Sequence, residues 1–301
     1  MELDAAIRFL TNHDGVLLAW ELRALYLVTI LYLLSFCLYC ASVLWPESRS
    51  GRVASRMLLA GVAIHMITVA LRIVETGRLP YRTLFEILLT FTCIAVIMYL
   101  FVEKRFRRIF IAGVPLVGVC FALCLYAILK CNPGNIPPLP ASRSELFACS
   151  VLITLVSFAA LSVAFSIEFG YIVLTKLIPL ANLSKYCRDI ETAARFHRAT
   201  HQFVLLAFPL LACGIAVGAA WGMQAYGRYW LWSPRETWSL ISWVIYALYL
   251  HSMTLSSWRS GGASVLKMAG FVCVFISLLY MGHMPGLSLA PGFDTGMYSF
   301  W

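Results

Sequence analysis

Charged residues are scarce in this chain of 301 residues. Asp, Glu, Lys and Arg together make up only 12% of the sequence, whereas apolar and aromatic residues make up 61%. A soluble domain contains about 25% charged residues, because a folded chain of this size keeps much of its surface in water. The composition therefore excludes a soluble globular fold, and its apolar content excludes a disordered or collagen-like chain. It predicts an integral membrane protein, organised as one domain over residues 1–301.

The motifs of conventional enzyme chemistry are also missing. The chain has no phosphate-binding glycine loop, no H-E-x-x-H zinc motif and no recognisable nucleophile triad. It has no C-x-x-C-H sequence, so it lacks the usual site for attaching haem covalently to itself. Most of its ten cysteines lie in apolar runs, where a thiol behaves as a small hydrophobic side chain. Hydrolase and nucleotide chemistry thus have no support, and any function lies within the bilayer or at its surface.

Long apolar runs, in contrast, are abundant. A run of about 20 residues crosses a bilayer as a helix, because lipid offers the backbone groups no other partners. Eight such runs predict an all-α polytopic protein with about eight transmembrane helices, and the even number places both termini on one side. The runs cover residues 22–45, 54–75, 83–102, 109–130, 145–175, 201–222, 237–256 and 265–282.

The basic residues indicate which side the termini occupy. The formal net charge is +9, and more than half of the 23 Lys and Arg residues fall in the loops that lie inside if the termini lie outside. Since Lys and Arg concentrate in cytoplasmic loops, both termini are predicted outside. The proline-rich loop 133–140, the segment 221–238 and the tail 283–301 then face outward. We interpret the positive charge as a topology signal and expect no nucleic-acid partner.

Tryptophan gathers in one part of the sequence. Five of the nine tryptophans lie between residues 221 and 243, where Arg228, Arg235 and Glu236 are interspersed. An interfacial aromatic belt is the simplest explanation for such rings. A surface of indoles and arginines also suits a flat apolar ligand with carboxylates at its edge. Haem, a quinone or a flat lipid fits that description, and composition alone does not choose among them.

Ionisable side chains within the apolar runs are the other functional candidates. His65, His201 and His251 lie within or at the edges of the runs, and a neutral imidazole is a common axial ligand of haem. A hydrogen bond to a neighbouring helix is the alternative role for each. Glu86 follows Arg82 by one helical turn and is expected to pair with it. Glu168 has no cation near it in the sequence.

The segment W-G-M-Q-A-Y-G-R-Y-W-L-W-S-P-R-E-T-W, residues 221–238, closely resembles the tryptophan-rich signature of the cytochrome c assembly family. This family groups the CcsA, CcmC and CcmF haem-handling proteins, and the CcsA branch is the most similar. The resemblance extends to A-F-P-L-L at residues 207–211 and to G-R-L-P-Y-R-T-L-F-E at residues 77–86. It implies a protein of the bacterial cytoplasmic membrane whose tryptophan-rich segment faces outward.

The resemblance also implies a function. Haem b, bound non-covalently, is held between transmembrane histidines and is then presented on the external indoles to the C-x-x-C-H thiols of an apocytochrome c. A membrane partner of the CcsB type supplies further contacts. The chain would be at most one component of a cytochrome c synthase, because the reacting groups belong to haem and the apocytochrome.

Individual residues can be matched to these roles. His251 matches the inner axial ligand of the family, and His65 and His201 are candidates for the second. Arg228 and Arg235 are expected to face the haem propionates. The residues expected to contact haem are Trp221, Tyr226, Arg228, Trp230, Trp232, Arg235, Trp238, His251, His65, His201 and Tyr298.

The sequence departs from the family pattern at three places. The Trp-Asp pair of the signature is Trp232-Ser233 here, and the two external histidines correspond to Ser150 and Tyr298. Tyrosine ligates ferric haem in some proteins, whereas serine rarely does. His283 is a candidate replacement on the outer side. These differences keep two alternatives open: a divergent membrane subunit or regulator without external haem ligation, and an exporter of a flat apolar molecule.

Overall fold

The computed structural model describes residues 2–45, 49–105, 110–131, 144–173, 190–254 and 262–281, and all regular structure within these ranges is helical. The eight long helices in this part of the chain correspond to the eight apolar runs, so the predicted all-α fold is confirmed. The helices are α1 (Glu2–Leu44), α2 (Ser50–Thr76), α3 (Leu84–Arg105), α4 (Phe110–Lys130), α5 (Glu145–Ile172), α7 (Ile190–Tyr226), α8 (Pro234–Ser252) and α9 (Gly262–Tyr280).

Two helices begin well before the runs that predicted them. α1 starts at Glu2 rather than near residue 22, and α7 starts at Ile190 rather than near residue 201. Both extensions contain charged residues, so hydropathy alone does not detect them, although their Glu, Ala and Arg residues favour a helix. Among the described residues, the candidate membrane spans of these two helices are Val16–Leu44 and Arg198–Tyr226.

Seven of the described helices are long and apolar enough to cross a membrane, which makes this an integral membrane protein. α8 is the exception, because its 19 residues include Arg235, Glu236, Ser239, Ser242 and His251. It packs along α9 and against α7. Neighbouring helices can therefore shelter part of its polar surface from lipid.

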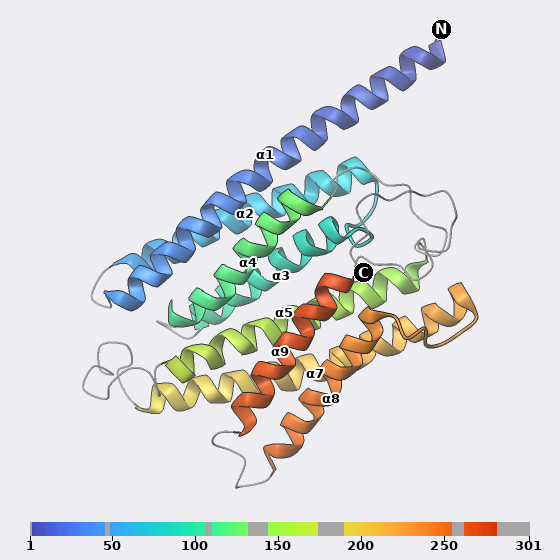
Figure 1. Cartoon of the computed structure of the whole chain (residues 1–301). Coiled ribbons are helices and arrows are strands. Elements are labelled where there is room, and N and C mark those ends of the chain that lie inside the picture. Colours follow the sequence, from blue (N-terminus) through green and yellow to red (C-terminus); the bar gives the residue numbers. More distant parts are fainter. Residues whose placement is uncertain are drawn as a thin grey trace.

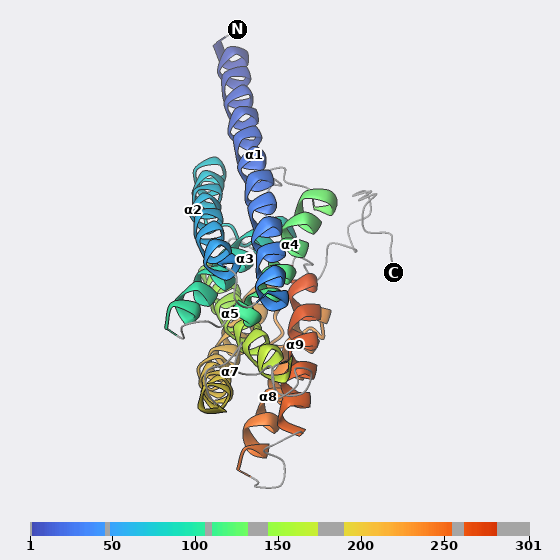
Figure 2. The same cartoon turned by 90° about the vertical axis from the view of Figure 1, so that its left-hand side faces the viewer.

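The helices form two groups that are joined through α3 and α5. α1, α2 and α4 lie on one side of this pair and α7, α8 and α9 on the other (Figures 1 and 2). The most extensive contacts are those of α5 with α7, α1 with α2 and α8 with α9, while α3 touches α2, α4 and α5. α3 and α5 thus form the core, where Val96 and Leu155 are fully enclosed.

The connections between helices alternate between two ends of the bundle (Figure 1). One end, which we call the tryptophan end, carries the turn 77–83 and the segment 227–233 between α7 and α8. The opposite end, which we call the basic end, carries Arg49, Arg52 and Lys104. The positive-inside pattern predicts this separation. Placement of the tryptophan end outside the cell stays a prediction.

Candidate functional site

α8 begins with a complete N-terminal cap, which orders the end of the tryptophan-rich segment. Ser233 is the N-cap residue, and its Oγ accepts a hydrogen bond from the backbone N–H of Glu236 at 3.4 Å. The Glu236 carboxylate accepts in return from the N–H of Ser233 at 3.2 Å and of Leu231 at 3.0 Å. Serine and aspartate are about equally good N-caps. The serine at this position therefore retains the cap that an aspartate would provide.

This capped turn holds Trp232 at the surface. The backbone of Trp232 has a φ of 56°, a left-handed conformation that side chains other than glycine rarely adopt. Its side chain is 72% exposed, and its ring lies edge-to-face with that of Trp230 at a centroid distance of 6.0 Å. Trp230 is half-buried, and its Nε1 has no hydrogen-bond partner among the described residues. The turn thus presents one open indole face, that of Trp232.

Trp221 lies beneath this surface. It is only 3% exposed and packs on Phe147 of α5 at a centroid distance of 4.8 Å. The ring of Tyr81, in the turn before α3, also packs on Phe147, at a centroid distance of 5.8 Å. Tyr226 meets Trp221 edge-to-face at a centroid distance of 5.6 Å. Trp221 therefore supports the segment from below. Tyr226 and Trp238, two of the residues expected to contact haem, are half-buried.

The two arginines of the segment have different surroundings. Arg228 is exposed. Arg235 is directed into the bundle, where its Nη2 donates to Ser150 Oγ at 3.2 Å and its Cζ lies 5.6 Å from the ring centroid of Phe147. The structure therefore positions Arg235 against α5.

Ser150 is fully buried in a close contact between α5 and α7. Its Oγ donates to the carbonyl oxygen of Gly214 at 3.0 Å, and a methyl group on Gly218 would lie 2.9 Å from the same Oγ. Gly214 and Gly218 form a G-x-x-x-G pattern, which lets helix backbones approach closely. An imidazole at residue 150 has no room unless α5 and α7 separate. In this chain the position serves a helix contact.

A cavity of about 30 Å³ lies beneath the segment. Its walls include Thr154, Gly218, Trp221, Trp230 and Arg235. A space of that size holds about one water molecule. A macrocycle is far larger than this cavity.

His201 and His251 lie on neighbouring helices near the basic end. His201 Nδ1 is 3.0 Å from the hydroxyl of Tyr249, which precedes His251 by two residues on α8. Because an α-helix turns by about 100° per residue, the side chain of His251 points away from that of Tyr249. His251 is accordingly exposed. It lies on the outside of the described helices.

His65 belongs to the other helix group. It is fully buried on α2, and its Nδ1 is 2.9 Å from the hydroxyl of Tyr32 on α1. α2 makes its extensive contacts with α1 and α3, whereas His201 and His251 are on α7 and α8. The structure therefore brings His201 to α8 and places His65 apart from both.

Glu168 has a cation that its sequence surroundings do not reveal. Lys267 Nζ of α9 lies 2.6 Å from the Glu168 carboxylate, and both side chains are buried. Ser264 of α9 donates to the same carboxylate. Lys267 also lies 5.2 Å from the ring centroid of Tyr249. Lys267 within an apolar run indicates a buried cation that needs a partner, but Glu168 lies 99 residues before it in the sequence.

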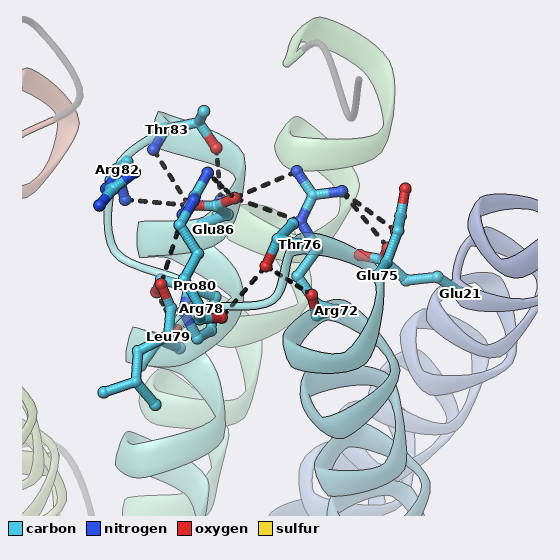
Figure 3. A network of polar contacts seen from close by, with 11 residues as sticks. Glu21, Arg72, Glu75, Thr76, Arg78, Leu79, Pro80, Arg82, Thr83 and Glu86 are labelled. Carbon is cyan, nitrogen blue, oxygen red and sulfur yellow. Dashed lines mark hydrogen bonds and ion pairs between the residues drawn. The ribbon is translucent and has the colours of Figure 1, made fainter. Parts of the chain in front are cut away.

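The expected side-chain pair of Glu86 with Arg82 is wrong. Arg78 Nη1 and Nη2 donate to the Glu86 carboxylate at 2.9 and 3.0 Å, and Arg72 Nη2 lies 3.2 Å away (Figure 3). Only the backbone N–H of Arg82 reaches it, at 2.9 Å. Arg72, which is fully buried, extends the network to Glu21 of α1 at 3.4 Å. Helical spacing predicted a pair within one turn, whereas the side-chain partners are Arg72 of α2 and Arg78 of the turn before α3.

Tyr298 and His283, the candidates for external ligation, lie outside the described residues, as do the loop 133–140 and the tail 283–301.

Comparison with known proteins gives consistent results. A family model described as Cytochrome C assembly protein matches residues 24–287. The cytochrome c biogenesis protein CcsA of Mesostigma viride is 27% identical over 235 residues, which cover 71% of this chain and 77% of that protein. CcsA of Synechococcus sp. (strain CC9902) is 26% identical over 271 residues, which cover 81% and 88%.

A solved structure, cytochrome c heme lyase CcmF, has a similar fold. It superposes with a TM-score of 0.68 at 16% sequence identity and covers 88% of this chain. The match covers 46% of the CcmF chain, so this protein spans about half the length of CcmF. The family model includes the described part of every helix from α2 to α9, together with the tryptophan-rich segment. The chain therefore belongs to the cytochrome c assembly protein family.

Proposed function

We propose that this protein binds haem non-covalently and presents it at the tryptophan end during maturation of c-type cytochromes. Membership of a cytochrome c assembly family supports the role in maturation. The observation that carries the haem proposal is Trp232, whose indole is 72% exposed on a capped, left-handed turn. An exposed indole that the backbone holds in one place is suited to stack on a flat aromatic ligand.

The residues at this end fit haem as a surface ligand. Trp232 and Trp230 supply apolar rings, and Arg235 supplies N–H donors for a carboxylate. Ser233 and Glu236 hold the turn, so the indoles are positioned before the ligand arrives. Haem itself would supply the vinyl groups with which the thiols of an apocytochrome c react. The protein's contribution is to bind and orient.

The basic end supports a second, inner contact. His251 is exposed on α8, and His201 lies nearby with its Nδ1 held by Tyr249. A hydrogen bond to one ring nitrogen fixes the orientation of an imidazole that binds metal through the other. We propose that His251 ligates haem, with His201 or a histidine of a CcsB-type membrane partner as its counterpart, since His65 lies apart in the other helix group. The proposed location is a bacterial cytoplasmic membrane with the tryptophan end outward.

One observation favours a second function. Ser150 fills a tight helix contact, so this position of α5, where the family pattern has a histidine, offers no axial ligand. A divergent membrane subunit or regulator would keep the fold and use the exposed indoles to bind a protein or lipid. Haem binding by the purified protein distinguishes the two functions.

The test is an absorption spectrum of the detergent-purified protein, oxidised and reduced, with a pyridine haemochrome assay of haem content. We expect stoichiometric haem that acid-acetone extracts. Trp232→Ala should lower retention several-fold, whereas Trp20→Ala, which removes another exposed indole from α1, should not. Haem-free protein after expression with ample haem and a CcsB-type partner would refute haem binding and support the subunit function.

A further inference from the structure

The Glu86 carboxylate has no capacity left for the side chain of Arg82. Three arginines surround it, but it accepts from Nε and Nη2 of Arg72, from Nη1 and Nη2 of Arg78, and from the backbone N–H groups of Arg82 and Thr83. The distances of these contacts run from 2.9 to 3.4 Å. A carboxylate offers about four lone-pair sites. The guanidinium of Arg82 is thus excluded from the network that its own backbone helps to build.

Among the described residues, the Arg82 guanidinium is consequently a cation without a counterion. Figure 3 shows it at the opposite end of the network from Glu21, with Glu86 between them. Its Cζ lies 5.6 Å from the ring centroid of Tyr81, and its Nε is buried without a hydrogen-bond partner. Within the described ranges, no carboxylate is within ion-pair distance of its guanidinium. A half-buried positive charge of this kind is stabilised when an anion binds to it.

The ring that supports Arg82 belongs to the same aromatic row as the tryptophan-rich segment. Tyr81 packs on Phe147 at 5.8 Å, and Phe147 packs on Trp221 at 4.8 Å. Arg235 lies over Phe147 at 5.6 Å. Two guanidinium groups, one from the turn before α3 and one from α8, therefore lie against one buried aromatic row at the tryptophan end. Tyr81 and Phe147 are 7% and 0% exposed, so these rings cannot stack on a ligand at the surface, whereas the exposed ring of Trp232 can.

We infer that Arg82 is a carboxylate-binding residue of this site and that, together with Arg235, it holds the two propionates of haem. The inference rests on the proposed haem-binding function and assigns the role expected of Arg228 to Arg82. A guanidinium presents five N–H donors in a planar fork that matches a carboxylate. Arg235 donates one of these to Ser150 and keeps others for a ligand.

A binding experiment with two porphyrins tests this assignment. Ferric protoporphyrin IX and its dimethyl ester share the same ring and iron, but only the former carries carboxylates. Each would be titrated into haem-free protein, purified in detergent from cells grown without added haem, while tryptophan fluorescence is recorded. We expect Arg82→Gln to weaken binding of the diacid by about tenfold, the usual order for a lost charged hydrogen bond. Affinity for the diester should stay unchanged, and Arg82→Lys should fall between.

The matched control is Arg23→Gln. Arg23 is an exposed arginine stacked on Trp20 at 5.2 Å, so its replacement removes one guanidinium from an aromatic ring outside the row. This variant should bind both porphyrins as the wild type does. If Arg82→Gln weakens both porphyrins equally, or neither, the assignment of Arg82 is overturned while haem binding stands. If the wild type binds neither porphyrin, the proposed function fails and the assignment fails with it.

Discussion

At residue 233 a serine stands where the related signature has aspartate, and the structure shows what this residue does. Its hydroxyl caps α8 and its N–H is bound by Glu236, which together fix the turn that carries Trp232. Ser233→Ala should lower the free energy of unfolding by about 1 kcal/mol, as N-cap losses usually do. Thermal unfolding in detergent, followed by circular dichroism, measures the change.

Two further variants make the Ser233 test specific. Ser233→Asp should match the wild type, because aspartate caps equally well. Ser144, the N-cap residue of α5, makes no side-chain cap bond, so Ser144→Ala should leave stability nearly unchanged. If Ser233→Ala and Ser144→Ala lowered the free energy of unfolding equally, the cap bond of Ser233 would make no specific contribution to stability.

Glu86 illustrates a buried carboxylate on which several cations depend. Its replacement by Gln leaves Arg72 fully buried with weakened neutralisation and frees Arg78. Breaking a buried ion pair by removing one partner costs about 3–5 kcal/mol. Glu86→Gln should therefore lower the unfolding temperature strongly, whereas Glu145→Gln, at an exposed position, should not. A small loss at Glu86 would show that water reaches the arginines and replaces the carboxylate.

At the scale of helices, Ser150 lies in the contact between α5 and α7, at the position where the family pattern has an external histidine. Ser150 and Thr154 of α5 face Gly214 and Gly218 of α7. A methyl group on Gly214 would lie 3.3 Å from the backbone nitrogen of Thr154, so only small residues fit in this contact. Ser150→His, which restores the imidazole of the family pattern, should therefore destabilise the protein by about 1–3 kcal/mol through overpacking. It should add no axial ligand, since the ring cannot lie between the helices.

The neighbouring residue provides the control for this variant. Cys149 is exposed on the same helix, so Cys149→His places an imidazole outside the contact and should leave stability unchanged. Unfolding temperatures and haem spectra of the two variants give the comparison. A stable Ser150→His protein with a new low-spin haem signal would show that α5 and α7 separate readily and that the site had lost only its ligand.

The helices could be predicted from the sequence, whereas the partners of their buried charges could not. Apolar runs predicted a helix for each of α1 to α9 because lipid permits little else. Glu168 and Lys267 lie on α5 and α9, and only packing shows that they are 2.6 Å apart. No pattern in the sequence indicated that Arg72 pairs with Glu86, and spacing alone predicted the pair of Arg82 with Glu86. Local periodicity contains no information about which helices become neighbours.

The sequence predicted which residues form the tryptophan-rich site but not which of their side chains are buried. The motif indicated an aromatic surface, and Trp232 is exposed as such a surface requires. Trp221, from the same motif, is buried by Phe147 of α5, a contact far away in the sequence. The left-handed backbone of Trp232 has no signal either, because a bulky residue there is sterically disfavoured. Burial within a motif depends on the neighbouring helices.

At the scale of the whole molecule, ionic groups tie the helices together at both ends. Glu21, Arg72 and Glu86 join α1, α2 and α3 near the tryptophan end, and Glu168 and Lys267 join α5 and α9. Basic residues outside these networks are concentrated at the basic end, as Arg49, Arg52 and Lys104 are. Such residues resist translocation, so the charge distribution favours a basic end in the cytoplasm and a tryptophan end outside.

This orientation can be measured with single cysteines at the two ends. Ser144→Cys lies at the tryptophan end and Arg49→Cys at the basic end, both just before a helix begins. In intact cells a membrane-impermeant maleimide should label Ser144→Cys above the wild-type background and leave Arg49→Cys unlabelled. Both should react after permeabilisation, which controls for accessibility. The opposite labelling would place the indoles in the cytoplasm, where they could not meet an apocytochrome c outside, and the proposed presentation of haem would have to be abandoned.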